Sequence, residues 1–188
     1  MTPPQTAQAP EASTAANARP AGKNSSSETK LHKTKNDLPL ETRTKMVKLL
    51  NARLADLGDL QTQTKQAHWN VKGPHFIALH KLFDDIYAAV GEYVDLTAER
   101  LVQLGGTAMG TARLTAANST LPEYPHDIYD GAAHVDALST ALATAGAHIR
   151  KAISEGEDAD DPDTVDVLTE ISRGLDQWLW FVEAHNQH

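Results

Sequence analysis

The stretch that decides the fold is residues 68–100, which read HWNVKGPHFIALHKLFDDIYAAVGEYVDLTAER. Gly73 and Pro74 interrupt the chain before an apolar run, and Gly105 and Gly106 follow it. Glycine and proline mark the ends of helices, so these pairs predict one long helix between them. Its apolar residues leave little of the helix for solvent: Phe76, Ile77, Leu79, Leu82, Phe83, Ile86, Val90, Val94 and Leu101.

Two pairs of possible metal ligands lie on one stripe of this helix. The histidine–aspartate pair, His80 and Asp84, and the carboxylate pair, Asp95 and Glu99, are each four residues apart. Residues at that spacing project from one face, one turn from each other. Imidazole and carboxylate groups without thiolates suit iron, manganese or zinc. Charges among apolar side chains need a partner or a metal, so the stripe is a candidate metal site, with His68 as a further ligand.

The length of the stripe excludes one bridged metal centre within a single helix. Asp84 and Asp95 are eleven residues apart, roughly 16 Å along the axis, whereas bridged metals lie about 3.5–4 Å apart. The pairs could form two separate sites, or solvated ion pairs. Alternatively, an antiparallel second copy of the helix brings its carboxylate pair opposite the histidine–aspartate pair of the first. The apolar surroundings favour this shared site, which a two-fold axis would produce twice.

Four motifs carry a resemblance to a known family: KQAHWNVKGPHFIALHKLFDDIYAAVGEYVDLTAERLVQLGG, YPHDIYD, IRKAISEGEDADD and LDQWLWFVEAHN. Over residues 36–186 the chain resembles Dps, the DNA-binding proteins from starved cells, which are mini-ferritins. The resemblance implies a ferroxidase site for iron at a two-fold interface, with five ligands: His68, His80, Asp84, Asp95 and Glu99. It implies that Trp69, beside the first ligand, quenches escaping radicals; packing at the interface explains this tryptophan equally well.

The resemblance also implies what the assembled protein does. We expect it to oxidise Fe(II), with hydrogen peroxide as the preferred oxidant. Ferric mineral would be stored in a hollow homo-dodecamer, and less hydroxyl-radical chemistry would occur near DNA. Two rival functions stay open: a non-catalytic protein that condenses the nucleoid, and a bundle that binds zinc or manganese for structure.

An acidic run lies near residue 160: Glu155, Glu157, Asp158, Asp160, Asp161, Asp163 and Asp166. Acidic residues favour the N-terminus of a following helix, and Asp161 with Pro162 reads as an N-cap and first helical position. In the Dps family, acidic residues in this region line a three-fold pore for ferrous ions. The resemblance therefore implies that Asp158, Asp161 and Asp166 are pore candidates, since a ring of carboxylates concentrates cations.

Residues 1–36 are rich in Ala, Pro, Ser and Thr, which predicts a disordered tail before a helical domain at 37–188. Through Asp37 the net charge is 5 − 3 = +2, against −8 for the chain. A solvated linker and a DNA-contacting arm explain this charge equally well, and the pI of about 5.5 is low for a DNA-binding domain. Tails on a closed shell would nevertheless add weak, sequence-independent phosphate contacts. Lysine-bearing tails in the Dps family condense DNA, so the candidate DNA-binding residues are Arg19, Lys23, Lys30, Lys33 and Lys35.

Four long helices are expected in the domain. The first runs from about Pro39 to His68, and the second carries the ligands. The connection over 105–126 is long enough for a crossover between parallel helices, with a short helix of its own. A third helix, beginning near Asp127 or Asp130, should end at Ser154, and a fourth should span 162–183. With no strand pattern, the expected fold is an all-α, ferritin-like four-helix bundle.

Cysteine content, targeting segments and the other histidines limit the possible chemistry and the expected compartment. The chain has no cysteine, which excludes disulfides and thiolate sites and fits a reducing compartment. No secretory signal or membrane span is recognised, so we expect a cytoplasmic, nucleoid-associated protein with no membrane partner. Glu123 and His126 have Glu-x-x-His spacing but enclose Pro125, which predicts a coincidence rather than a ligand pair. His134 and His148 lack a matching carboxylate stripe, so we expect core or surface roles.

Overall fold

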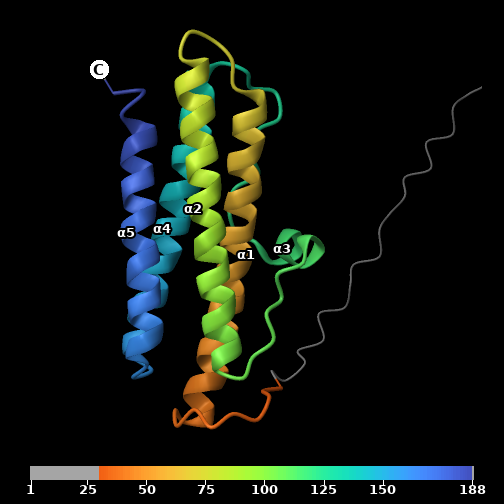
Figure 1. Ribbon diagram of the computed structural model, residues 1–188, viewed down its shortest axis with the longest axis vertical. Helices are drawn as coiled ribbons and strands as arrows, with labels where there is room; N and C mark the ends of the chain where they lie inside the picture. Colours follow the sequence, from red (N-terminus) through yellow and green to blue (C-terminus); the bar gives the residue numbers. More distant parts are fainter. Residues whose placement is uncertain (1–29, 188) are drawn as a thin grey trace, which may run out of the picture.

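The computed structural model describes residues 30–187, whose regular elements are all helices. In chain order they are α1 (Leu40–Asn70), α2 (Phe76–Gln103), α3 (Ala112–Asn118), α4 (Gly131–Glu157) and α5 (Pro162–Glu183). The four long helices form a bundle, and α3 lies outside it against α1 (Figure 1). The prediction of an all-α four-helix bundle is confirmed.

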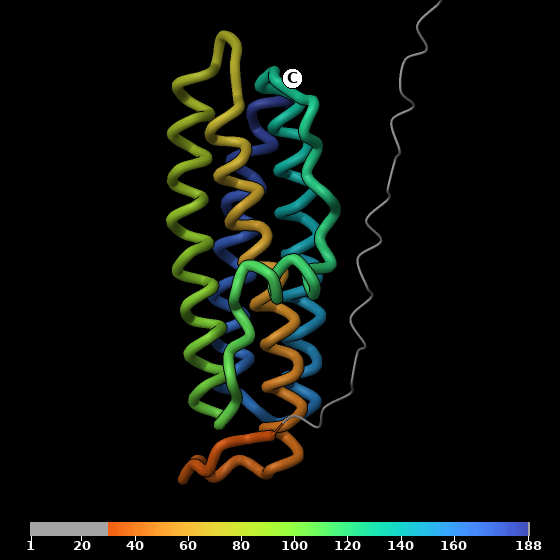
Figure 2. The backbone as a smooth tube through the Cα atoms, turned by 90° about the vertical axis from the view of Figure 1, so that its right-hand side faces the viewer, coloured from red at the N-terminus to blue at the C-terminus, as the bar shows by residue number. Residues whose placement is uncertain are grey.

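The connection between α2 and α4 runs back along the bundle. α2 finishes at one end, and the chain then passes through α3 and returns to the other end, where α4 begins (Figure 1 and Figure 2). α2 and α4 are therefore parallel, which confirms the predicted crossover and its short helix. A backbone hydrogen bond from Lys72 N to Tyr129 O (2.9 Å) ties the α1–α2 turn to the start of α4.

α1 forms because its sequence combines a good start with an apolar face. Pro39 precedes the first turn with φ −52°, a value that its ring imposes and that suits a helix start. Leu50, Leu54, Leu57 and Leu60 recur every three or four residues and are at most 2% exposed, which is the spacing of one helix face. This face packs on α2 and α4, so the α1–α2 hairpin is held rigidly where the candidate ligands lie.

Aspartate caps begin both C-terminal helices. The Asp130 side chain accepts a hydrogen bond from Ala133 N (3.0 Å) at the start of α4. Asp161 accepts one from Thr164 N (3.1 Å) at the start of α5, where Pro162 is the first helical residue. The predicted N-cap at Asp161 is confirmed, and Asp130 settles which of the two predicted starts of α4 is used.

α4 continues beyond its predicted end at Ser154 and reaches Glu157. Gly156 lies inside the helix because α5 packs closely there: a Cβ at this position would lie 3.0 Å from Val165 Cγ2. The chain reverses afterwards through Asp160, whose φ is 55°. Gly156 therefore serves close packing of α4 against α5.

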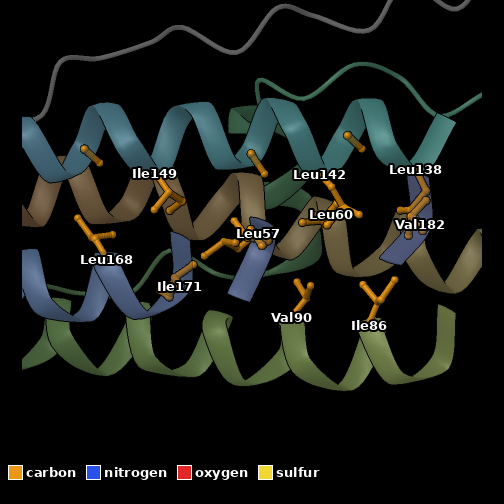
Figure 3. Packing of buried hydrophobic residues seen from close by; sticks show 14 of the residues in the cluster. Leu57, Leu60, Ile86, Val90, Leu138, Leu142, Ile149, Leu168, Ile171 and Val182 are labelled. Atoms are coloured by element: carbon orange, nitrogen blue, oxygen red, sulfur yellow. The ribbon is translucent and has the colours of Figure 1, made fainter. Parts of the chain in front are cut away.

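The core fills the space between the four long helices (Figure 3). Phe83 of α2 is completely buried and is the largest of its fully buried side chains. The same core contains aliphatic residues from every long helix, among them Leu57, Leu60, Ile86, Val90, Leu138, Leu142, Ile149, Leu168, Ile171 and Val182. Each such burial contributes roughly 1.5–3 kcal/mol.

The segment before α1 lies against the far end of α2. His32 N donates to Gly105 O (2.7 Å), and Gly105 has φ +89°, which suits glycine. Of the predicted DNA-binding residues, Lys30, Lys33 and Lys35 are exposed in this segment. Arg19 and Lys23 lie outside the described residues, as does most of the predicted tail at 1–36.

None of the helices between residues 30 and 187 combines the length and apolar character needed to cross a bilayer.

Candidate metal centre

His68 at the end of α1 and His80 near the start of α2 lie face to face, with ring centroids 3.7 Å apart and planes at 22°. His68 Nδ1 donates to the backbone oxygen of His80 (2.7 Å), and His80 Nδ1 donates to that of His68 (2.9 Å). Because a carbonyl can only accept, both Nδ1 atoms carry a proton, so in the neutral form of each ring the free lone pair is on Nε2. A histidine that binds a metal through one ring nitrogen usually donates the N–H of the other nitrogen to a carboxylate, a backbone carbonyl or water.

Asp84, one turn after His80, is exposed and forms an ion pair with Lys65 of α1. Its Oδ1 also lies 3.8 Å from His68 Nδ1. The hydrogen bond from Lys65 holds the pKa of Asp84 below its usual value of 3.8. The Lys65 ammonium lies 4.9 Å from the centroid of the Tyr87 ring. Lys65 therefore occupies a carboxylate oxygen that a metal ion would use, a contact that the sequence reasoning missed although Lys65 precedes His68 by three residues on one face.

Replacement of Lys65 by glutamine should tighten binding of the first divalent cation. The change removes a positive charge that competes for Asp84, while the carboxylate stays ionised at pH 7 because even its usual pKa is far lower. Anaerobic calorimetric titration with Fe(II) should therefore give a lower Kd for Lys65→Gln than for the wild type. Lys81→Gln, which removes an exposed lysine next to His80 on α2, is the matched control and should leave the Kd unchanged. Equal Kd values for Lys65→Gln and Lys81→Gln would show that Lys65 does not compete with the cation for Asp84.

The carboxylate pair lies further along α2, and both Asp95 and Glu99 are exposed. Glu99 lines a shallow cavity of about 390 Å³ with Ala98, Val102 and Gln103. Within residues 30–187, no group of three or more His, Asp or Glu side chains has the geometry to hold a metal ion. The fold thus brings His68, His80 and Asp84 together and leaves the carboxylate pair roughly 16 Å along the same helix.

Trp69 is directed away from the bundle and is 67% exposed, although its neighbour His68 is buried. It lines a cavity of about 520 Å³ together with Lys65 and Tyr87. The indole therefore stands beside the candidate centre, on the surface that the α1–α2 hairpin presents outward.

Comparison with known proteins agrees with this architecture. Residues 47–188 match the Ferritin-like domain family. The DNA protection during starvation protein of Agrobacterium fabrum is 48% identical over 158 residues, which cover 84% of this chain and 98% of that protein. The chain belongs to the Dps family.

Solved Dps structures share the fold along almost their whole length. DpsA14 from Streptomyces coelicolor superposes with a TM-score of 0.81 at 34% identity, covering 86% of this chain and 96% of that one. The tetragonal form of Mycobacterium smegmatis Dps gives a TM-score of 0.79 at 30% identity, covering 84% and 96%. The ferritin-like fold class predicted from the sequence is confirmed.

The acidic run at the α4–α5 turn separates into exposed and buried members. Asp158 and Asp166 are exposed. The assignment of Asp161 to a pore needs correction, because its side chain is 1% exposed and its oxygens are engaged by Arg100 and Thr164. Asp161 caps α5 and pairs with a buried arginine, so its carboxylate faces the protein interior.

The arginine that holds Asp161 follows the predicted ligand Glu99 directly. Arg100 is 5% exposed; its Nη2 lies 2.7 Å from Asp161 Oδ1, and its Nε donates to Thr164 Oγ1 (3.0 Å). Sequence reasoning missed this pair because its members are 61 residues apart. It joins the end of α2 to the start of α5.

The sequence also did not predict a second buried carboxylate, that of Asp56 in α1. It is 1% exposed, and its Oδ2 lies 2.9 Å from Arg53 Nη2 and 3.0 Å from His148 Nδ1. Its Oδ1 accepts hydrogen bonds from the backbone and the hydroxyl of Thr120. His148 therefore has a structural partner, and this cluster ties α1 to α4 and to the connection after α3.

The Glu123–His126 pair stays at the surface. His126 Nε2 lies 3.3 Å from Glu123 Oε1, and both side chains are largely exposed. His134, in contrast, is 1% exposed and hydrogen-bonded to Tyr124.

Proposed function

We propose that this protein is a ferroxidase that oxidises Fe(II) with hydrogen peroxide and stores the ferric product inside a homo-dodecameric shell, thereby protecting DNA. The observation that carries the proposal is the reciprocal pairing of His68 and His80, in which both Nδ1 atoms bond to backbone oxygens, next to the carboxylate of Asp84, whose Oδ1 lies 3.8 Å from His68 Nδ1. Nitrogen and oxygen donors of this kind suit ferrous iron, the substrate. Membership of the Dps family supports the same conclusion.

The site is completed across a two-fold axis. His68, His80 and Asp84 of one protomer face Asp95 of the partner subunit and Glu99 of the partner subunit. The spacing along α2 supports this arrangement, because a helix antiparallel to α2 brings the second pair opposite the first. The exposure of Asp84, Asp95 and Glu99 in the protomer leaves all three carboxylates available to an interface.

The chemistry follows from the donor set. Hydrogen peroxide accepts one electron from each of two ferrous ions, takes up two protons and leaves as two water molecules. The carboxylates favour the ferric product because they offset its higher charge, and the imidazoles fix its position through their carbonyl-held rings. Lys65 must leave Asp84 when iron binds. Trp69, which follows His68 directly, intercepts a radical that escapes from the centre.

Passage of ions and contact with DNA use other residues. We place Asp158 and Asp166 at the opening through which ferrous ions enter the shell, where clustered carboxylates raise the local cation concentration. The N-terminal tail supplies the DNA contacts through Arg19, Lys23, Lys30, Lys33 and Lys35. Its contacts are sequence-independent and occur in the cytoplasm, at the nucleoid.

Iron loading followed by size-exclusion chromatography and metal analysis tests the proposal. Iron-free protein given Fe(II) and hydrogen peroxide should oxidise the iron and carry it in the fractions that contain the assembled shell. Protein that assembles but leaves Fe(II) unoxidised would contradict the ferroxidase. Retention of zinc or manganese through the same treatment would instead support a structural metal site, and DNA condensation without iron chemistry would support a nucleoid protein.

Removal of residues 1–36 should abolish DNA binding and leave peroxide-dependent iron oxidation intact. The tail carries the clustered lysines, whereas the candidate ligands lie on α1 and α2. Gel-shift titration at several salt concentrations measures the loss, since phosphate contacts fall steeply with salt.

Two further variants separate the effect of the lysines from the effect of shortening the tail. Removal of residues 1–29 retains the basic segment and should preserve part of the binding, whereas Lys30→Gln with Lys33→Gln and Lys35→Gln in the full chain should weaken it without shortening the tail. Full DNA binding by the protein lacking residues 1–36 would show that the helical domain holds the DNA.

A further inference from the structure

Tyr124 is a buried phenol with a buried base as its partner. It lies in the connection between α3 and α4 and is 5% exposed. Its hydroxyl lies 2.7 Å from Nδ1 of His134, which is in the first turns of α4 and 1% exposed. The two rings are close to parallel, at 22°, with centroids 6.1 Å apart. The iron chemistry proposed above uses neither residue.

The proton positions at this pair follow from burial. Burial lowers the pKa of His134 below its usual 6.5, against smaller opposing effects from Asp130 and the backbone of Asn70. Burial raises the pKa of the Tyr124 hydroxyl far above its usual 10.0. At neutral pH the phenol therefore keeps its proton and donates it to a neutral imidazole. The Nε2 atom of His134 is also buried, so the whole ring is shielded from solvent.

Tyr124 shares a cavity with residues that flank the candidate iron centre. Tyr124 lines the cavity of about 520 Å³ that Lys65, Gln66, Trp69 and Tyr87 also line. Lys65 is the ion-pair partner of Asp84, and Trp69 follows His68. One cavity is thus lined both by neighbours of the candidate ligands and by a buried phenol whose proton acceptor is already in place.

We propose that Tyr124 and His134 form a redox-active pair that reduces one-electron oxidants arising when ferrous iron meets hydrogen peroxide. A hydroxyl radical takes one electron from the phenol and one proton from solvent and becomes water. The phenol O–H bond breaks, and its proton moves to His134 Nδ1. A further ferrous ion returns an electron to the tyrosyl radical and becomes ferric, while His134 gives the proton back.

This inference rests on the proposed function, because the iron centre supplies the oxidant. Its redox part can nevertheless be tested on iron-free protein with azide radicals generated by pulse radiolysis, a small one-electron oxidant. Electron paramagnetic resonance of the frozen sample should show a tyrosyl radical, and ring-deuterated tyrosine should narrow its spectrum. High-field spectra of the wild-type radical should show its hydrogen bond to the imidazole, a readout that needs no variant.

Three variants assign the radical. Tyr124→Phe should lose most of the tyrosyl signal, whereas Tyr129→Phe, which removes a phenol that is 59% exposed, should keep it. His134→Gln keeps the phenol but removes the base, so the radical yield should fall and its formation should slow. A structural hydrogen bond alone would give the same radical yield in Tyr124→Phe and the wild type, and that result would overturn the inference.

The same measurement after mixing wild-type protein with Fe(II) and hydrogen peroxide links the pair to the iron centre. Iron oxidation with no Tyr124 radical would overturn the inference and leave the proposed function standing. A Tyr124 radical produced by azide radicals in a protein that does not oxidise iron would overturn the proposed function and leave the redox pair. A Tyr124 radical accompanied by iron oxidation supports both.

Discussion

Two inactive variants should regain iron oxidation when they assemble in one shell. His80→Ala with Asp84→Ala removes the first half of the proposed site, and Asp95→Asn with Glu99→Gln removes the second half. Each double variant alone should lose more than the about 10–100-fold that follows loss of a residue that merely supports a ligand. The peroxide-dependent oxidation rate of Fe(II) measures this loss.

Mixed assembly distinguishes a shared site from one within a single chain. In a dimer of the two variants, the histidine–aspartate pair of one chain meets the carboxylate pair of the other at one site, while the second site lacks both pairs. If subunits are unfolded and reassembled at random in equal amounts, half of the dimers are mixed and half of their sites are complete. Activity should therefore recover to about a quarter of the wild-type value, because each isologous interface holds two equivalent sites.

A chain with all four substitutions provides the control. Mixed with an equal amount of wild type, it should also leave about a quarter of the activity if the site is shared, because mixed dimers have no complete site. A site within one chain would leave about half in this mixture and none in the mixture of the two double variants. Those two results together would exclude the intersubunit centre.

Local signals in the sequence were sufficient for most of the fold. The Gly-Pro and Gly-Gly interruptions bound α2 closely, and Pro162 after Asp161 marks the start of α5 correctly. The end of α4 differs from the expected Ser154, because the helix continues to Glu157 with Gly156 inside it, where α5 packs closely. The length of the connection after Gly105 predicted the crossover, since a shorter loop could not reach the opposite end of the bundle.

The candidate site was predictable in its ligands but not in its hydrogen bonds. Helical spacing placed His80 near Asp84, and the structure adds the reciprocal carbonyl contacts and Lys65. Those contacts depend on how two helices face each other, which a one-dimensional pattern does not contain. The same limit explains Asp161: its cap position is local information, whereas its buried partner Arg100 is 61 residues away.

Loss of Arg100 should be among the most destabilising single changes in the chain. Arg100→Met keeps the length and apolar stem of the side chain but leaves the Asp161 carboxylate buried without its counter-charge. Removing one partner of a buried pair costs about 3–5 kcal/mol. For a chain of this size, thermal unfolding at a fixed protein concentration should therefore show a Tm lower by roughly 6–20 °C.

Burial, not the ion pair itself, makes Arg100 important, and two comparisons test that distinction. Arg150 also pairs with an aspartate, Asp176, at 2.8 Å, but both side chains are about half exposed. Solvent screens such a pair, so Arg150→Met should cost only about 0–1 kcal/mol. Adding Asp161→Asn to Arg100→Met removes the stranded charge while asparagine still caps α5, so the double variant should recover much of the lost Tm. Equal Tm values for Arg100→Met and Arg150→Met would show that the α2–α5 junction does not depend on this pair.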